Sequence, residues 1–149
     1  MKKIVLLIAC LSLTSSAFAK KRSFGLGIIV GEPTGITGKY FFDQTQAVDF
    51  GISYSFDKFV YAYADYLKHF PHAFGKSSKF VYELAPYVGV GLGVGLDHDV
   101  LVAARIPLGI EWMIPRSQIG LFLELVPGLA VIPSTTFRFG GGIGVRFFF

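Results

Sequence analysis

The stretch Ala47-Val48-Asp49-Phe50-Gly51-Ile52-Ser53-Tyr54-Ser55-Phe56 alternates between large apolar residues and small or charged ones. In an extended chain, successive side chains point to opposite faces. One face of this stretch therefore carries Val48, Phe50, Ile52, Tyr54 and Phe56, and the other carries Asp49, Gly51, Ser53 and Ser55. A period of two predicts a β-strand whose two faces meet different surroundings.

The same alternation recurs along the rest of the chain. In the final segment, Phe137, Phe139, Ile143, Val145, Phe147 and Phe149 oppose Arg138, Gly140, Gly142, Gly144 and Arg146. Turn-forming residues separate eight such segments. They are Phe24–Gly31, Gly35–Phe42, Ala47–Phe56, Phe59–Phe70, Val81–Leu96, Val100–Ile114, Ile119–Ile132 and Phe137–Phe149. We expect one all-β domain.

The composition indicates where the bulky faces point. Hydrophobic residues make up 52% of the chain and the mean hydropathy is +0.56, yet no stretch after Ala19 predicts a transmembrane helix. A soluble core would need a second layer over these faces, and the sequence supplies no polar exterior for it. In a membrane barrel the apolar face meets lipid and the closed sheet satisfies every backbone group. The sequence predicts a single eight-stranded antiparallel up-and-down transmembrane β-barrel over residues 20–149.

Residues 1–19 have the parts of a secretory signal peptide. A basic start at Lys2 and Lys3 precedes an apolar run from Ile4 to Leu13 and the ending Ala17-Phe18-Ala19. Cleavage after Ala19 would remove Cys10, leaving no disulfide and no thiolate ligand. The two lysines would leave as well, so 12 of the 14 basic residues would face 10 acidic ones. This near balance gives no reason to expect a nucleic-acid partner.

The small-residue faces also carry ionisable groups. The positive groups are Lys39, Arg105, Arg138 and Arg146, and the negative ones are Asp49, Asp65, Glu83, Glu111 and Glu124. Since an isolated buried ion is costly, we expect these groups to pair across the interior and to hydrogen-bond with Tyr61, Tyr63 and Ser53. Eight strands leave an interior only about wide enough for side chains. The prediction is a charge-plugged, non-conducting barrel, with a hydrated lumen that solvates each ion as the alternative.

Two features fit a regular barrel less well. Pro86, Pro107 and Pro127 fall inside predicted strands, where each removes a ladder hydrogen bond, so we expect bulges or local phase shifts there. The connection from Pro71 to Phe80 is the longest one, and it would be periplasmic if both termini are.

Aromatic residues gather near the ends of the segments, as expected of the girdles at membrane interfaces.

No catalytic or metal site is expected. Small barrels that act on lipid need a serine, a histidine and an acidic residue where lipid can reach them. Here His69 should point inward beside the rim, and His72 and His98 fall in connections. Because His69 and His72 have no third ligand in sight, we expect no metal and no other cofactor.

The chain from Phe24 to Phe149 resembles a family of short bacterial outer-membrane barrels, distantly similar to the OmpA and OmpX transmembrane domains. The resemblance rests on Gly25-Leu26-Gly27-Ile28-Ile29-Val30-Gly31-Glu32-Pro33-Thr34-Gly35, on Ile132-Pro133-Ser134-Thr135, and on the ending Gly141-Gly142-Ile143-Gly144-Val145-Arg146-Phe147-Phe148-Phe149. It implies a location in the outer membrane, with lipid as the surroundings and a monomeric state.

The last residues resemble the signal by which such barrels reach the outer-membrane assembly machinery. This implied signal is the terminal Phe149 with apolar residues at alternating positions before it, namely Ile143, Val145 and Phe147. The assembly machinery is thus an implied partner during biogenesis. The family brings no established activity and no catalytic residues.

Four functional classes remain open at the level of sequence. A structural or surface-interaction barrel is favoured, because every regularity above serves membrane insertion. Glycines on the inner face of the first, fifth and eighth segments motivate a small pore or a conduit that binds lipid. A soluble ligand-binding barrel of the lipocalin type and an enzyme acting on lipid are the other two classes.

Overall fold

The computed structural model describes residues 23–54, 60–96 and 99–149. The predicted signal peptide, Ser55, Phe56 and His98 lie outside these residues. The elements are β1 (Phe24–Glu32), β2 (Thr34–Phe41), β3 (Gln46–Tyr54), β4 (Val60–His69), α2 (Lys79–Glu83), β5 (Leu84–Leu96), β6 (Val100–Arg105), β7 (Leu108–Met113), β8 (Ile119–Ile132) and β9 (Thr136–Phe148).

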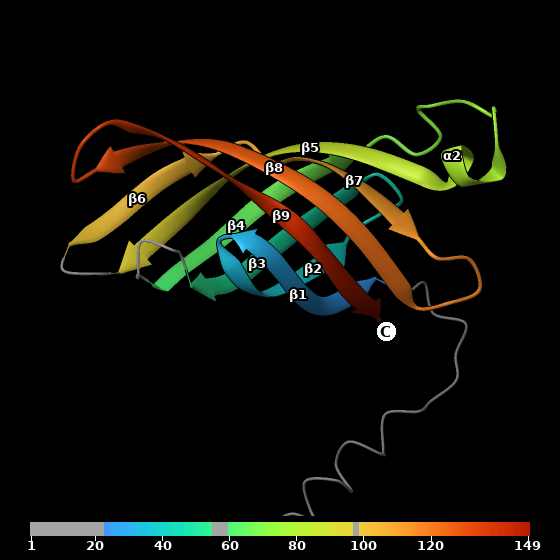
Figure 1. The fold of residues 1–149 in the computed structure, drawn as a ribbon, viewed down its shortest axis with the longest axis horizontal. Coiled ribbons are helices and arrows are strands. Elements are labelled where there is room, and N and C mark those ends of the chain that lie inside the picture. Colours follow the sequence, from blue (N-terminus) through green and yellow to red (C-terminus); the bar gives the residue numbers. More distant parts are fainter. Residues whose placement is uncertain (1–22, 55–59, 97–98) are drawn as a thin grey trace, which may run out of the picture.

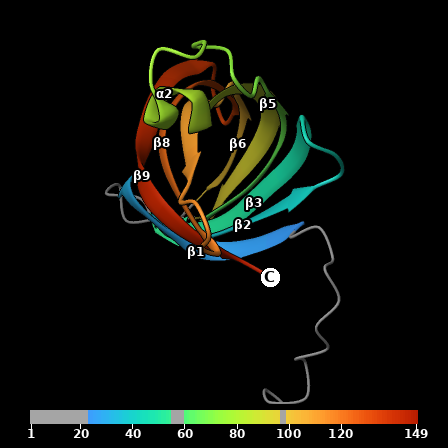
Figure 2. The same ribbon diagram turned by 90° about the vertical axis from the view of Figure 1, so that its right-hand side faces the viewer.

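The strands form a closed antiparallel barrel (Figures 1 and 2). Neighbours in the chain pair with one another, and β1 pairs with β9 to close the sheet. β6 and β7 both lie between β5 and β8 and are separated by Ile106 and Pro107 alone, so they form one interrupted strand. The barrel therefore has eight strands, and the predicted fold class is confirmed.

The prediction of bulges at the three prolines is wrong. The pairing with β5 keeps one register on both sides of Pro107, and β8 pairs with β9 without a shift through Pro127. The register shift in this wall lies between Val102 and Ala103. The carbonyl oxygens of Pro86, Pro107 and Pro127 still accept backbone hydrogen bonds, at 2.8 to 2.9 Å. Each proline removes a donor but leaves its acceptor in place, so the register survives.

The two faces of the wall differ as the alternation predicts. On β3, the side chain of Ile52 is 66% exposed whereas that of Asp49 is fully buried. The same division holds on β9, where Phe139 is exposed and Arg146 is buried. The barrel thus turns its apolar side chains outward and encloses its charges. Within the described residues, no helix is long and apolar enough to cross a membrane.

The segment before β5 differs from the prediction. Ser78 caps a short helix, α2, by accepting a hydrogen bond from the Val81 backbone N–H through its hydroxyl oxygen at 3.2 Å. Residues 81–83 therefore belong to this helix, and β5 begins at Leu84. A side-chain cap can outweigh a short run of alternating residues, because it supplies a partner to an otherwise unpaired helix N–H.

The barrel has two distinct ends. We call the end at which β1 begins and β9 finishes the terminal end, and the other the distal end. The connection containing α2 also lies at the terminal end, where it projects beyond the strands (Figure 1). The connections that join β1 to β2 and β8 to β9 lie at the distal end.

Candidate functional site

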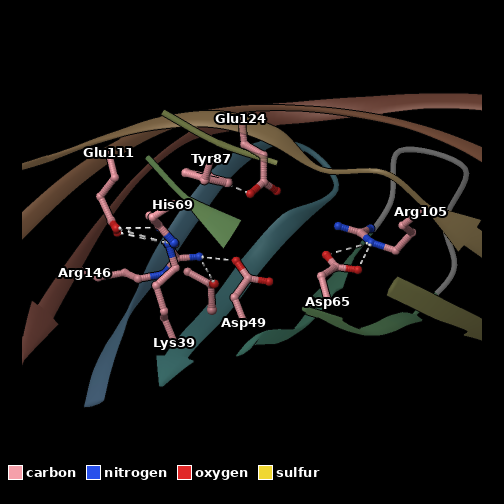
Figure 3. Close-up of polar contacts among 10 residues, drawn as sticks. Lys39, Asp49, Asp65, His69, Tyr87, Arg105, Glu111, Glu124 and Arg146 are labelled. Carbon is pink, nitrogen blue, oxygen red and sulfur yellow. Dashed lines mark hydrogen bonds and ion pairs between the residues drawn. The ribbon is translucent and has the colours of Figure 1, made fainter. Parts of the chain in front are cut away.

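The candidate site is the charged interior of the barrel (Figure 3), and the Glu111 carboxylate on β7 is the centre of its main cluster. The Lys39 ammonium donates to both carboxylate oxygens at 3.2 Å. His69 Nε2 lies 3.3 Å from Oε2, and Arg146 Nη1 lies 3.6 Å from Oε1. These groups come from four different strands, so one buried carboxylate ties several parts of the wall together.

Arg146 extends the cluster to β3. Its Nη2 donates to Asp49 Oδ2 at 2.8 Å and to Thr37 Oγ1 at 2.7 Å. The guanidinium also lies over the Phe122 ring, 3.8 Å from its centroid, in cation–π geometry. Buried charges are tolerated where they are paired and hydrogen-bonded, and Arg146 and Asp49 meet this condition together. We call Lys39, Asp49, His69, Glu111 and Arg146 the interior network.

A layer of apolar and aromatic side chains lies beside the network, toward the terminal end. Phe148 and Leu67 are fully buried, and Phe41 bridges the layer, with ring centroids 6.0 Å from Phe148 and 5.0 Å from His69. Tyr87 packs with Leu67 in the same region. We call Phe41, Leu67, Tyr87 and Phe148 the aromatic floor.

The alternation of residues alone did not predict the aromatic floor. The signal was present, since these four residues and Phe122 occupy positions that the alternation assigns to the small-residue face. A large aromatic residue that interrupts that face marks a place where the interior is filled.

A second charged pair lies apart from the interior network. Arg105 Nε donates to both oxygens of Asp65, at 3.0 and 3.1 Å, and its guanidinium lies 4.1 Å from the centroid of the Tyr63 ring. Glu124 accepts a hydrogen bond from the Tyr87 hydroxyl at 2.7 Å. Ser53 is predicted to hydrogen-bond with the interior charges. Its hydroxyl instead donates to the Tyr61 backbone carbonyl at 3.2 Å.

Glycines make room for the interior aromatic side chains. A Cβ atom at Gly93 would clash with the Tyr61 ring, and one at Gly144 would clash with the Phe122 ring. Each large side chain therefore lies against a neighbouring strand where no Cβ is present. This packing accounts for Gly93 on β5 and Gly144 on β9 without requiring an open channel.

The distal end is less filled than the terminal end. A cavity of about 50 Å³ that opens to solvent lies among Pro33, Tyr61, Arg105, Val126 and Arg138. Its lining mixes charged and apolar side chains. The lining includes Arg105, which is held by Asp65.

The structure brings most of the predicted interior charges inside the barrel. Those that are buried are Lys39, Asp49, Asp65, Arg105, Glu111, Glu124 and Arg146. Arg138 is half-buried and lines the distal cavity. The prediction that Glu83 belongs to the interior charges is wrong. This residue lies in α2, and its carboxylate accepts a hydrogen bond from Trp112 Nε1 at 3.2 Å.

The histidines and the buried acids form no metal site among the described residues. His69 is directed into the interior network, and His72 Nδ1 donates to the Tyr82 carbonyl at 2.8 Å. Asp49 Oδ1, His69 Nδ1 and Arg146 Nε have no hydrogen-bond partner within the described part of the chain. Side chains alone therefore do not satisfy every polar atom of the network.

No family model and no curated protein matches this sequence. Two solved structures have a similar fold. The chain is similar to the N-terminal β-barrel domain of Pseudomonas aeruginosa OprF, with a TM-score of 0.64 and 18% identity over 87% of this chain and 98% of that one. It is also similar to a de novo designed transmembrane β-barrel, with a TM-score of 0.58 and 16% identity over 89% of this chain and 100% of the design. The chain therefore has the fold of transmembrane β-barrels.

Proposed function

We propose that this protein is an integral outer-membrane β-barrel whose interior is closed by paired charges and the aromatic floor, and whose role is structural or in surface interaction. The observation that carries the proposal is the inverted distribution of side chains. Apolar residues such as Ile52 and Phe139 face outward, while Lys39, Asp49 and Arg146 are enclosed. In water such an outer surface would promote aggregation, whereas lipid tails solvate it.

The outer membrane is the membrane that fits best. Both the predicted signal peptide and the apolar alternation before Phe149 support export and barrel assembly. In the structure Ile143, Val145, Phe147 and Phe149 are exposed on the outer wall, so an assembly factor could contact all four. Deletion of Phe149 should therefore lower the yield of assembled barrel far more than Lys21→Ala does. Equal yields would contradict the proposed signal.

Fractionation of cell envelopes tests the membrane location. Membranes washed with urea should retain the protein, and unheated samples should migrate differently from boiled ones on a gel, because a folded barrel resists the detergent at room temperature. Release of the protein by the urea wash would contradict the proposal.

The interior gives no support to an enzymatic role, and we propose that the protein is not an enzyme. His69 contacts Glu111 and Lys39 and is almost fully buried, so it is not presented to a substrate. A general base must come within hydrogen-bond reach of the proton that it removes, and the buried His69 ring packs against Phe41 and Tyr87 of the aromatic floor.

The distal cavity favours one alternative, a barrel that binds a small hydrophobic or amphipathic ligand. The cavity is small, about 50 Å³, but it opens to solvent and has both charged and apolar side chains in its lining, which suits one end of an amphipathic ligand. A fluorescent fatty acid should then bind the folded wild type saturably, and Ala103→Trp should abolish binding by filling the cavity. Absence of saturable binding to the wild type would remove this alternative.

A further inference from the structure

The connection from Phe70 to Glu83 is unusual for a barrel of this size. Turns at the periplasmic end of such barrels are short, whereas this connection contains a helix and several aromatic residues. Its exposed aromatic side chains are Phe70, Phe74, Phe80 and Tyr82. We call residues 70–83 the rim segment. Its exposed rings indicate that another surface covers them.

The rim segment has a defined internal structure. The rings of His72 and Tyr82 stack with their centroids 3.9 Å apart, and His72 also donates to the Tyr82 carbonyl. Ser78 caps α2. These contacts join the two ends of the rim segment and fix the start of α2.

The rim segment is attached to the outer wall of the barrel. Phe80 packs edge-on against Trp112 at a centroid distance of 5.0 Å, and the Trp112 indole donates to Glu83. Trp112 neighbours Glu111 on β7, whose side chain points inward, so Trp112 lies on the outward face. The contacts of Phe80 and Glu83 with Trp112 therefore place α2 beside the outer face of β7, at the terminal end of the barrel (Figure 2).

Positive charge accompanies these aromatic residues. Lys76 and Lys79 are both exposed, and the one acidic side chain of the segment, Glu83, is engaged by Trp112. Aromatic rings prefer the depth of lipid headgroups, and lysine stems can follow them while the ammonium groups reach the phosphates. Each lysine that lies beside an anionic headgroup strengthens the attraction to that lipid.

We propose that the rim segment binds the headgroups of anionic phospholipids, with Phe74 and Phe80 in the interfacial layer and Lys76 and Lys79 on the phosphates. The inference rests on the proposed membrane insertion. It adds a lipid preference that a simple aromatic girdle does not have, since a girdle of neutral rings does not distinguish one headgroup charge from another.

Trp112 allows a direct test, because it is the single tryptophan of the chain and touches the rim segment. The full chain is refolded into vesicles of phosphatidylcholine and phosphatidylglycerol, in which either one lipid or the other carries bromine. Bromine quenches tryptophan only at close range. We expect phosphatidylglycerol to be enriched around Trp112 on the order of fivefold over its share of the lipid.

Two double variants separate charge from structure. Lys76→Gln with Lys79→Gln should reduce the enrichment to about one, and Lys76→Arg with Lys79→Arg should keep it. Equal quenching by the two lipids in the wild type would overturn the inference, as would unchanged enrichment in the glutamine variant. Quenching by neither lipid, together with no shift on heating, would instead contradict membrane insertion itself, and the inference would fall with it.

Discussion

The two ends of the barrel interior are filled in different ways. Toward the terminal end, Glu111 holds Lys39 and Arg146 beside the aromatic floor, and these side chains are almost completely buried. Toward the distal end, Arg105, which is paired with Asp65, borders a cavity of about 50 Å³ that opens to solvent. The proposed closure of the barrel therefore depends on the filled layer near the terminal end. Under this proposal the distal end can vary without opening a pore.

The largest effect is expected at the centre of the sealed layer. Glu111→Gln removes the carboxylate that pairs with the buried Lys39 ammonium, while Arg146 keeps Asp49 as its partner. Breaking a buried ion pair in this way costs about 3–5 kcal/mol of the free energy of unfolding. Guanidinium unfolding of the refolded protein measures this loss. The matched control Glu83→Gln lies in α2 and should change stability by less than about 0.5 kcal/mol. Similar losses in the two variants would contradict a stabilising role for the network.

Loss of a side chain from the aromatic floor should lower the free energy of unfolding almost as much. Phe148→Ala empties a fully buried site and should destabilise the barrel by about 3–4 kcal/mol. The neighbouring Phe147 faces outward, so Phe147→Ala should cost clearly less in the same unfolding experiment. If the exposed phenylalanine proved the more costly of the two, the sealed layer would not be where this account places it.

Glycine packing is expected to have a smaller effect. Gly93→Ala forces a methyl group against the Tyr61 ring and should destabilise the barrel by about 1–3 kcal/mol. Tyr61→Ala in the same chain relieves the clash, so the double variant should lose less than the sum of the two single changes. Simple additivity would show that the ring does not require the glycine.

The smallest effect concerns the exposed turn between β2 and β3, at the terminal end. The backbone N–H of Thr45 donates to the Asp43 carboxylate and, with the N–H of Gln46, holds the pKa of Asp43 below its ordinary value of 3.8. A lowered folded-state pKa means that the turn is stabilised above the ordinary value and loses this contribution as the pH falls through the folded-state pKa. Asp43→Asn should speed hydrogen exchange at Thr45 and Gln46 at neutral pH. Unchanged exchange would contradict the role of the carboxylate.

The alternation of residues was sufficient to predict the closed eight-stranded barrel and the inward direction of charges such as Asp49 and Arg146. It could not predict that Glu111 would be the centre of the network. Which inward side chains meet depends on the stagger of the strands around the closed barrel, and pattern along one strand carries no such information.

Local chemistry explains the errors. The predicted strand begins at Val81 and so directs Glu83 inward, whereas the Ser78 cap starts a helix there. A register shift is predicted at Pro107. The proline ring removes one backbone hydrogen-bond donor where the chain passes from β6 to β7, but the register with β5 does not change. Phe148 was overlooked because its bulk does not fit the pattern of the inner face, although that misfit is itself the sign of a filled interior.

Conductance of the purified wild-type barrel in planar lipid bilayers tests the central claim most directly. Because the interior network and the aromatic floor together fill the terminal half of the barrel, the account predicts inserted protein with no stable ion-conducting state. Heat-dependent migration of the same preparation confirms that the barrel is folded. Stable, stepwise ion conductance by the folded wild type would contradict the closed interior.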